Sequence, residues 1–368
     1  MNPGTDKRTV LTLDAGGTNL VFTAIRGNQD ITEPVTLPSR GDQLNTCIDS
    51  IEEGFRALMK RIDDKPAAIS FAFPGPSDYR TGVIGKLNNL PAFTGGIPLG
   101  PILQHRFSLP VFINNDGDLY AYGEALSGFL PEVNALLEQK GVNRRFRNLI
   151  GLTLGTGFGG GLVINEQLLT GDNSMAGEVW LFRNRLNPET NAEEGISIRA
   201  VQRVYYVKTG MENSEALTPR DIFDIASGKK EGNSSAAIEA FSQLGTILGD
   251  VLGNLLTVFD SAVVIGGGLS GAMSLIFPAL MQEIKAAYKA YSGSAYPRLV
   301  QKVFNMSDPV DRAEFLNWEK TEIAVPGSGE KIAYHGEARI PLGLSSIGTS
   351  RAISLGAYAY ALKQLDQM

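Results

Sequence analysis

Glycine-rich turns and one dipeptide with a carboxylate side chain are the candidate functional residues of this chain. The run 154–161 (Leu-Gly-Thr-Gly-Phe-Gly-Gly-Gly) lies between two apolar segments, 148–154 and 161–165, which predicts the tight turn of a β-hairpin. Glycine lets backbone N–H groups point toward one position and lets an anion approach without meeting a Cβ atom. The run therefore predicts a phosphate-binding loop, with a turn that binds no ligand as the alternative.

Two further glycine clusters occur in the chain. Residues 14–19 (Asp-Ala-Gly-Gly-Thr-Asn) connect two predicted strands and offer amides and a hydroxyl to phosphate and the Asp14 carboxylate to Mg²⁺. In isolation, this segment would more often be a plain hairpin turn with Asp14 as a turn residue. Residues 266–271 lie between a predicted strand, 261–265, and a predicted helix, 272–291. They match the dinucleotide fingerprint, but the strand that follows has no acidic residue, which argues against nicotinamide or flavin.

Asn115 and Asp116 are the candidate reactive pair. They follow the predicted strand 110–114 and precede the predicted helix 117–127. A carboxylate between the end of a strand and the start of a helix is well placed to contact a ligand, and the helix dipole favours the ionised form that a general base needs. An N-cap aspartate is the alternative. We interpret Asp118 as a solvated or capping charge in the first helical turn.

Composition limits the possible partners. The chain has 368 residues, enough for two domains, and a net charge of −6, which argues against nucleic acid or an anionic membrane as the main partner. Its single cysteine, Cys47, lies on the apolar stripe of a predicted helix, 44–62, and suits a reducing compartment. No signal peptide is visible, and the most apolar helix, near 241–259, carries polar residues. We therefore expect a cytoplasmic protein.

Hydrophobic periodicity predicts an α/β protein. The first 115 residues follow the order β-β-β-α-β-α-β, with the second helix near 99–107, and this order is typical of an α/β layered domain. The later segments are a surface loop or helix at 131–147, a long helix at 237–259, a strand at 298–304 and a closing helix at 350–365. Residues 305–345 are rich in glycine, proline and charge, so we expect an insertion of loops or short hairpins there.

The order of these clusters resembles the sugar-kinase branch of the actin-like ATPase superfamily, and most closely the ROK family (repressors, open reading frames, kinases). Residues 14–19 resemble its first phosphate motif, 154–161 its second and 264–268 its adenosine motif. Segments 73–76, 114–116 with 123–124, and 176–178 also match. The resemblance spans about residues 8–290 and the last helix.

The resemblance implies an α/β fold with two ribonuclease-H-like (actin-like ATPase) domains and a central cleft that binds ATP. The N-terminal lobe would comprise residues 1–117 and 351–368, and the C-terminal lobe residues 118–350 with the insertion at 305–345. By matched position, Asp116 would be the catalytic base. The residues matched to sugar contacts are Gly75, Asn115, Asp116, Glu178 and Glu193. The residues matched to nucleotide contacts are Asp14, Gly16, Gly17, Thr18, Asn19, Gly155, Thr156, Gly157, Gly267, Gly268 and Leu269. Asp14 would hold Mg²⁺ through water.

The chain departs from the family pattern at one sugar contact and at the zinc site. Leu181 stands where the family has a histidine that serves both the sugar and a structural zinc. The cysteine-rich zinc motif is missing, and one cysteine with His105 and His335 cannot build a Cys₃His site, so we expect no structural zinc. Trp180 could stack on a sugar face, although core packing is favoured for an aromatic side chain.

We therefore predict an ATP-dependent, Mg²⁺-requiring hexose kinase of glucokinase type that phosphorylates a primary hydroxyl group. A kinase for N-acyl-hexosamines and a sugar-binding sensor without turnover are the alternatives. A transcriptional repressor would need a helix-turn-helix domain before the first strand, where we count only about eight residues. The resemblance to the ROK family also implies a homodimer.

Overall fold

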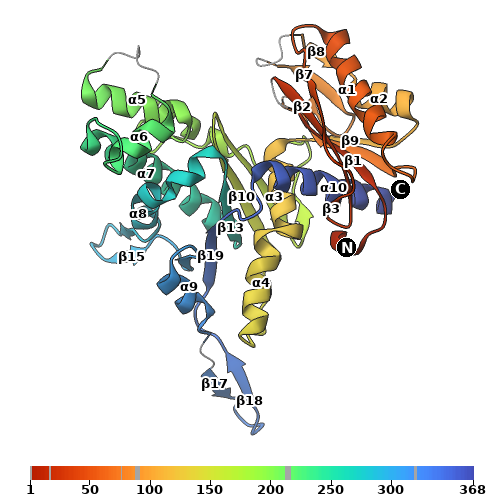
Figure 1. Ribbon diagram of the computed structural model, residues 1–368. Helices are drawn as coiled ribbons and strands as arrows, with labels where there is room; N and C mark the ends of the chain where they lie inside the picture. The colour runs from red at the N-terminus through yellow and green to blue at the C-terminus, as the bar shows by residue number, and fades with distance from the viewer. Residues whose placement is uncertain (1, 16–17, 76, 88–91, 212–216, 319–320) are drawn as a thin grey trace.

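Two mixed β-sheets organise the chain, one in each lobe (Figure 1). The structure is a computed structural model that describes residues 2–15, 18–75, 77–87, 92–211, 217–318 and 321–368. Gly16 and Gly17, matched to the first phosphate motif, lie outside the described residues.

The N-terminal lobe contains a sheet with the strand order β3-β2-β1-β5-β9, in which β4 also pairs with β2. The strands are β1 (Val10–Ala15), β2 (Asn19–Arg26), β3 (Gln29–Asp30), β4 (Val35–Pro38), β5 (Ala68–Ala72) and β9 (Val111–Asn114). The β1–β2 pair is antiparallel, whereas β1, β5 and β9 run parallel. This order brings the carboxyl ends of β1 and β9 to the same edge of the sheet, so it points Asp14 and Asp116 toward one region.

Helices cover this sheet with an aromatic core. Helix α1 (Leu44–Met59) places Phe55 against Phe22 and Phe71, with ring centroids 5.1 and 6.1 Å apart respectively. Cys47 on the same helix is 1% exposed, which confirms its predicted place in the core. Helix α2 is Leu99–Phe107, the range predicted from the sequence.

The C-terminal lobe contains a second sheet with the strand order β12-β11-β10-β13-β19-β16. The strands are β10 (Leu149–Leu154), β11 (Phe158–Ile164), β12 (Gln167–Leu168), β13 (Ala262–Gly266), β16 (Lys302–Asn305) and β19 (Arg339–Leu344). The β10–β11 hairpin is antiparallel, and β10, β13, β19 and β16 run parallel. The glycine-rich run therefore forms the predicted hairpin turn, beside the end of β13.

Helices of the C-terminal lobe pack through small residues. They are α5 (Ile198–Thr209), α6 (Pro219–Ala226), α7 (Ser234–Val258) and α8 (Met273–Ile284). A Cβ atom added to Gly245 of α7 would lie 2.4 Å from the carbonyl oxygen of Ile276 on α8. Glycine at this position therefore permits the close approach of the two backbones.

Helices α3 (Asp116–Ser127) and α10 (Thr349–Gln367) cross at the junction of the lobes (Figure 1). Helix α3 packs on β10 and β11, whereas α10 packs on β1 and β5. Added Cβ atoms on Gly123 and Gly356 would lie 1.9 Å from the carbonyl oxygen of Ala352 and 1.8 Å from that of Leu119. Only glycine fits at these two positions, so the crossing is a backbone-to-backbone contact.

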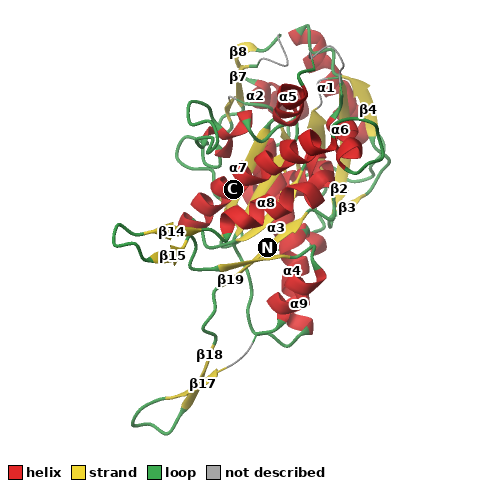
Figure 2. Cartoon of the chain, turned by 90° about the vertical axis from the view of Figure 1, so that its left-hand side faces the viewer, coloured by secondary structure: helices red, strands yellow, loops and turns green. Residues whose placement is uncertain are grey.

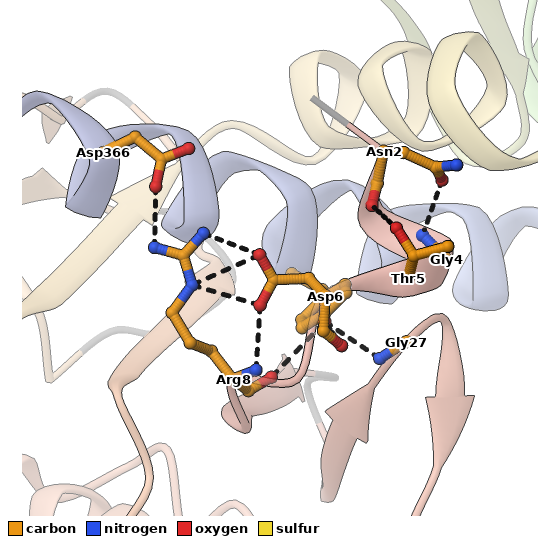
Figure 3. A network of polar contacts seen from close by, with 8 residues as sticks. Asn2, Gly4, Thr5, Asp6, Arg8, Gly27 and Asp366 are labelled. Carbon is orange, nitrogen blue, oxygen red and sulfur yellow. Dashed lines mark hydrogen bonds and ion pairs between the residues drawn. The ribbon is translucent and has the colours of Figure 1, made fainter.

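The N-terminal segment is joined to the end of α10 by a polar network (Figure 3). The Arg8 guanidinium group pairs with Asp6 and with Asp366, each at 2.7 Å. The Tyr358 hydroxyl accepts the Gly27 N–H at 2.9 Å. These contacts tie the first strand of the N-terminal lobe to the last helix of the chain.

Two segments differ from the sequence prediction. A small sheet of β6 (Ser77–Asp78), β7 (Val83–Lys86) and β8 (Thr94–Ile97) was not predicted. The loop or helix expected at 131–147 begins as helix α4 (Phe129–Gln139), which agrees with the second option. The helix expected at 272–291 ends at Ile284, because the chain then forms the hairpin β14 (Ala287–Lys289) and β15 (Ala295–Pro297).

The expected insertion at 305–345 is wrong for its last residues. Strand β19 lies inside the sheet between β13 and β16, and Ile340 and Leu342 are fully buried. The part that extends beyond the lobe is the hairpin of β17 (Thr321–Ala324) and β18 (Lys331–Tyr334), as Figures 1 and 2 show, and α9 (Pro309–Leu316) precedes it.

Candidate functional site

A cleft of about 570 Å³ lies between the two lobes and contains most of the predicted site residues. The N-terminal side contributes Gly75 and the dipeptide Asn115-Asp116. The C-terminal side contributes the glycine turn of β10–β11 and the start of the turn after β13. Residues that line the cleft include Pro74, Gly75, Asn115, Asp116, Asp118, Gly155, Thr156, Gly157, Glu178, Trp180, Glu193, Gly267, Thr349 and Ile353.

Asn115 and Asp116 are fixed by the turn from β9 into α3. Asn115 is the N-cap of α3, and its Oδ1 atom accepts the Gly117 N–H at 2.7 Å. Asp116 is the first residue of the helix, and its Oδ1 atom accepts the same N–H at 2.9 Å. Asparagine is a favoured N-cap because its side chain satisfies a free backbone donor. The cap therefore leaves the Asp116 carboxyl group directed at the cleft.

The environment of Asp116 raises the pKa of its carboxyl group. Desolvation by the surrounding protein is the main cause, and the negative charge of Asp14 adds to it, whereas the Gly117 N–H opposes it. A raised pKa makes the ionised carboxylate a stronger base, which suits the abstraction of a proton from a hydroxyl group.

Glu193 stabilises the β10–β11 turn through a hydrogen bond. The Glu193 Oε2 atom accepts the Phe158 N–H at 3.0 Å, and its Oε1 atom lies 3.3 Å from the Arg199 guanidinium group. A Cβ atom on Gly157 would lie 2.7 Å from Glu193 Oε2, so a side chain there would displace the Glu193 carboxylate. Glu193 therefore supports the turn as well as lining the cleft.

The turn after β13 presents backbone to the same cleft. Gly267 has φ 89° and donates its N–H to Thr349 Oγ1 at 2.9 Å. An added Cβ atom at Gly268 would meet nothing within 4 Å, so open space surrounds that residue. Leu269 is 2% exposed and belongs to the core of the C-terminal lobe, so its side chain does not line the cleft.

Glu178 enters the cleft at the start of a short 3₁₀ helix, Val179–Leu181. The Trp180 Nε1–H group donates a hydrogen bond to Glu178 Oε2. Trp180 also packs against the core of the C-terminal lobe, so it contributes both to packing and to holding a cleft carboxylate. Leu181 is 57% exposed and is not among the residues that line the cleft.

Asp14 lies at the end of β1, close enough for its charge to raise the pKa of Asp116. It is half-buried and does not line the cleft, and Thr18 and Asn19 are exposed. Among the described residues, no three His, Cys, Asp or Glu side chains are grouped so that they could hold a metal ion. No helix in the described part of the chain is both long and apolar enough to cross a lipid bilayer.

The interpretation of Asp118 as a solvated or capping charge is wrong. Its side chain is 3% exposed and lines the cleft, because α3 packs directly on the glycines of β11. A Cβ atom on Gly161 would lie 2.8 Å from the Asp118 Cα atom. Sequence pattern alone does not separate a buried acid in a first helical turn from an exposed one. The neighbouring glycine-rich strand was the available signal.

Comparison with known proteins places the chain in a family. Residues 10–310 match the model of the ROK family. The chain belongs to the ROK family. Its fold is therefore the two-lobed, ribonuclease-H-like fold of the actin-like ATPases, and its named relatives include sugar kinases.

Individual relatives of this ROK chain differ in the sugar that their names give. The crystal structure of a glucokinase from Parabacteroides distasonis is 47% identical and covers 99% of each chain, with a TM-score of 0.89. An N-acetyl-D-glucosamine kinase from Aliivibrio salmonicida is 26% identical over 325 residues, which is 83% of this chain and 98% of the relative. A glucokinase from Halalkalibacterium halodurans is 26% identical over 313 residues, 78% of this chain and 86% of the relative.

Proposed function

We propose that this ROK sugar kinase transfers the γ-phosphoryl group of MgATP to a hydroxyl group of glucose. The observation that supports the proposal is the convergence of two glycine turns, at Gly155–157 and Gly267, with Asn115-Asp116 and Glu178 on one cleft. The 47% identity to a protein named glucokinase, over almost the full length of both chains, favours glucose as the sugar.

In this proposal, each group has one task. The backbone amides of the glycine turns hold the phosphates, while Asn115 and Glu178 bind sugar hydroxyl groups. Asp116 takes the proton from the attacking hydroxyl as the new O–P bond forms, and ADP leaves. The cleft supplies fixed dipoles where charge develops, so little reorganisation is needed in the transition state.

Asp14 fits a role toward Mg²⁺. Magnesium keeps several waters and is usually held by one or two carboxylates together with substrate phosphates. A single carboxylate at the end of β1, close enough to Asp116 to raise its pKa, matches that requirement. When bound, the metal would neutralise phosphate charge, and Asp14 would hold it through water.

The second candidate is N-acetyl-D-glucosamine phosphorylation, which the name of the Aliivibrio relative favours. ADP release with MgATP, measured over glucose, mannose and N-acetylated hexosamines, separates the two. We expect the highest kcat/KM with glucose. The highest kcat/KM with N-acetylglucosamine would replace glucose as the substrate, and sugar binding without any ADP release would indicate a sensor. Formation of a homodimer stays a prediction, measured by light scattering after gel filtration.

A further inference from the structure

Asp118 is a buried acid to which the proposed reaction gives no task. Its side chain is 3% exposed, and its Oδ1 atom is sealed from solvent with no hydrogen-bond partner among the described residues. It lines the same cleft as Asp116 and Glu178. A buried carboxyl oxygen without a hydrogen-bond partner lowers the free energy of unfolding, so a functional role for Asp118 would explain its presence.

Asp118 and the residue before Glu178 pack against neighbouring glycines of β11. A Cβ atom on Gly161 would lie 2.8 Å from the Asp118 Cα atom. A Cβ atom on Gly177 would lie 3.1 Å from the carbonyl oxygen of Gly160. Gly177 directly precedes Glu178 and has φ 84°, a conformation that favours glycine. Both acids therefore follow backbone that packs on the same strand, and both line the cleft.

The charges that act on Asp118 are negative. Burial raises the pKa of its carboxyl group well above the ordinary value, and Glu178 and then Asp116 raise it further. Among the described residues, its charge also raises the pKa of the phenols of Tyr360, on α10, and Tyr79, in the N-terminal lobe. An ionised Asp118 would therefore be an unpaired charge among like charges. The neutral acid avoids this cost and gains an O–H donor.

Glu178 lines the same cleft and has an acceptor oxygen to offer. Its Oε2 atom already receives the Trp180 Nε1–H, which leaves Oε1 to accept a second hydrogen bond. Two carboxyl groups that lie close together stabilise one shared proton, because both cannot ionise without repulsion.

We propose that Asp118 is a positioning residue that shares one proton with Glu178 and thereby orients the Glu178 carboxylate toward a hydroxyl group of the sugar. This inference rests on the proposed function, because it takes Glu178 as a sugar ligand. It adds a specific task for Asp118, which acts through Glu178 and not on the reacting atoms.

A double-mutant cycle on sugar binding tests the proposal. Trp180 fluorescence reports glucose binding in a Trp318→Phe background, since the chain has two tryptophans. Asp118→Asn keeps a neutral donor, whereas Asp118→Leu removes it. We expect Asp118→Asn to bind glucose within about threefold of the parent and Asp118→Leu to bind about tenfold or more weakly. In a Glu178→Gln background, Asp118→Leu should weaken binding far less.

Two results would overturn the inference. If Asp118→Asn weakens binding as much as Asp118→Leu, the negative charge and not the donor is required. If the effects of Asp118→Leu and Glu178→Gln multiply, the two side chains act independently.

The protonation state of Asp118 has its own readout, which does not depend on sugar. Its raised pKa means that the folded state binds the proton more tightly, so the free energy of unfolding should fall as pH rises through that pKa. Asp118→Asn should lack this slope, and the infrared band of a protonated carboxyl group should disappear in the variant. Identical slopes and bands would refute the neutral acid. Failure of the parent to bind any sugar would instead count against the proposed function.

Discussion

Substitution of Gly123 by alanine tests the junction that carries Asp116. The added Cβ atom would lie 1.9 Å from the Ala352 carbonyl oxygen, across the α3–α10 crossing. An ordinary C···O contact is about 3.3 Å or more, so the helices must separate by about 1.4 Å. Overpacking of this kind costs about 1–3 kcal/mol, and a backbone carbonyl cannot rotate away as a side chain can, so we expect the upper end.

This cost predicts a loss of both stability and activity. For a lobe of this size, about 2–4 °C of Tm is lost per kcal/mol, so Gly123→Ala should lower Tm by about 6–12 °C. Because α3 begins at Asp116, a displacement of about 1 Å should also lower kcat by about a hundredfold. Gly356→Ala, on the opposite helix, should behave in the same way.

Thermal unfolding followed by circular dichroism, together with ADP release below the new Tm, measures both effects. Ser350→Ala, an exposed substitution on α10, is the matched control and should leave Tm and kcat unchanged. A Gly123→Ala protein with the Tm and kcat of the parent would show that the helices do not meet at their backbones, and the account of the junction would be wrong.

Three further predictions concern charged groups. Arg298→Met should lower the free energy of unfolding by about 3 kcal/mol in a urea titration, because it removes the buried ion-pair partner 2.5 Å from Glu283. A loss below about 1 kcal/mol would contradict this prediction. Asp14→Asn should move the acid limb of the pH profile of kcat/KM to lower pH, because the Asp14 charge raises the pKa of Asp116. An acid limb at the same pH as in the parent would refute this electrostatic link. Glu193→Ala should raise KM for both sugar and ATP by about tenfold, because the β10–β11 turn loses the hydrogen bond from the Phe158 N–H to Glu193. A change in only one of the two KM values would contradict a role of Glu193 toward both the turn and the sugar.

Much of the fold could be predicted because its signals are local. Strands β5 and β9 are short apolar runs bounded by proline, glycine or asparagine, and helix α2 has its predicted bounds. The order of the glycine turns indicated the family, and the turn at Gly155–157 and the dipeptide at Asn115-Asp116 line one cleft. These features depend on local backbone conformation, which the positions of glycine, proline and asparagine predict directly.

The parts that could not be predicted depend on tertiary packing. Strand β19 carries Pro341 and Gly343, residues that argue against a strand inside a sheet, yet it pairs with neighbours on both sides. Asp118 looked exposed because aspartate in a first helical turn is usually solvated, and only the glycines of the facing strand bury it. The strand pairing of β19 and the burial of Asp118 both depend on residues that lie more than 30 positions away in the chain.

In the proposed reaction, Asp116 acts as a base toward a sugar hydroxyl in the cleft between the lobes. The most direct measurement is kcat for ADP release by Asp116→Asn with MgATP and glucose, alongside sugar binding and with Asp64→Asn as an exposed control. We predict a loss of about a hundredfold or more in kcat with sugar binding retained, and no loss in the control. A variant that binds glucose and turns over at the rate of the parent would contradict the account.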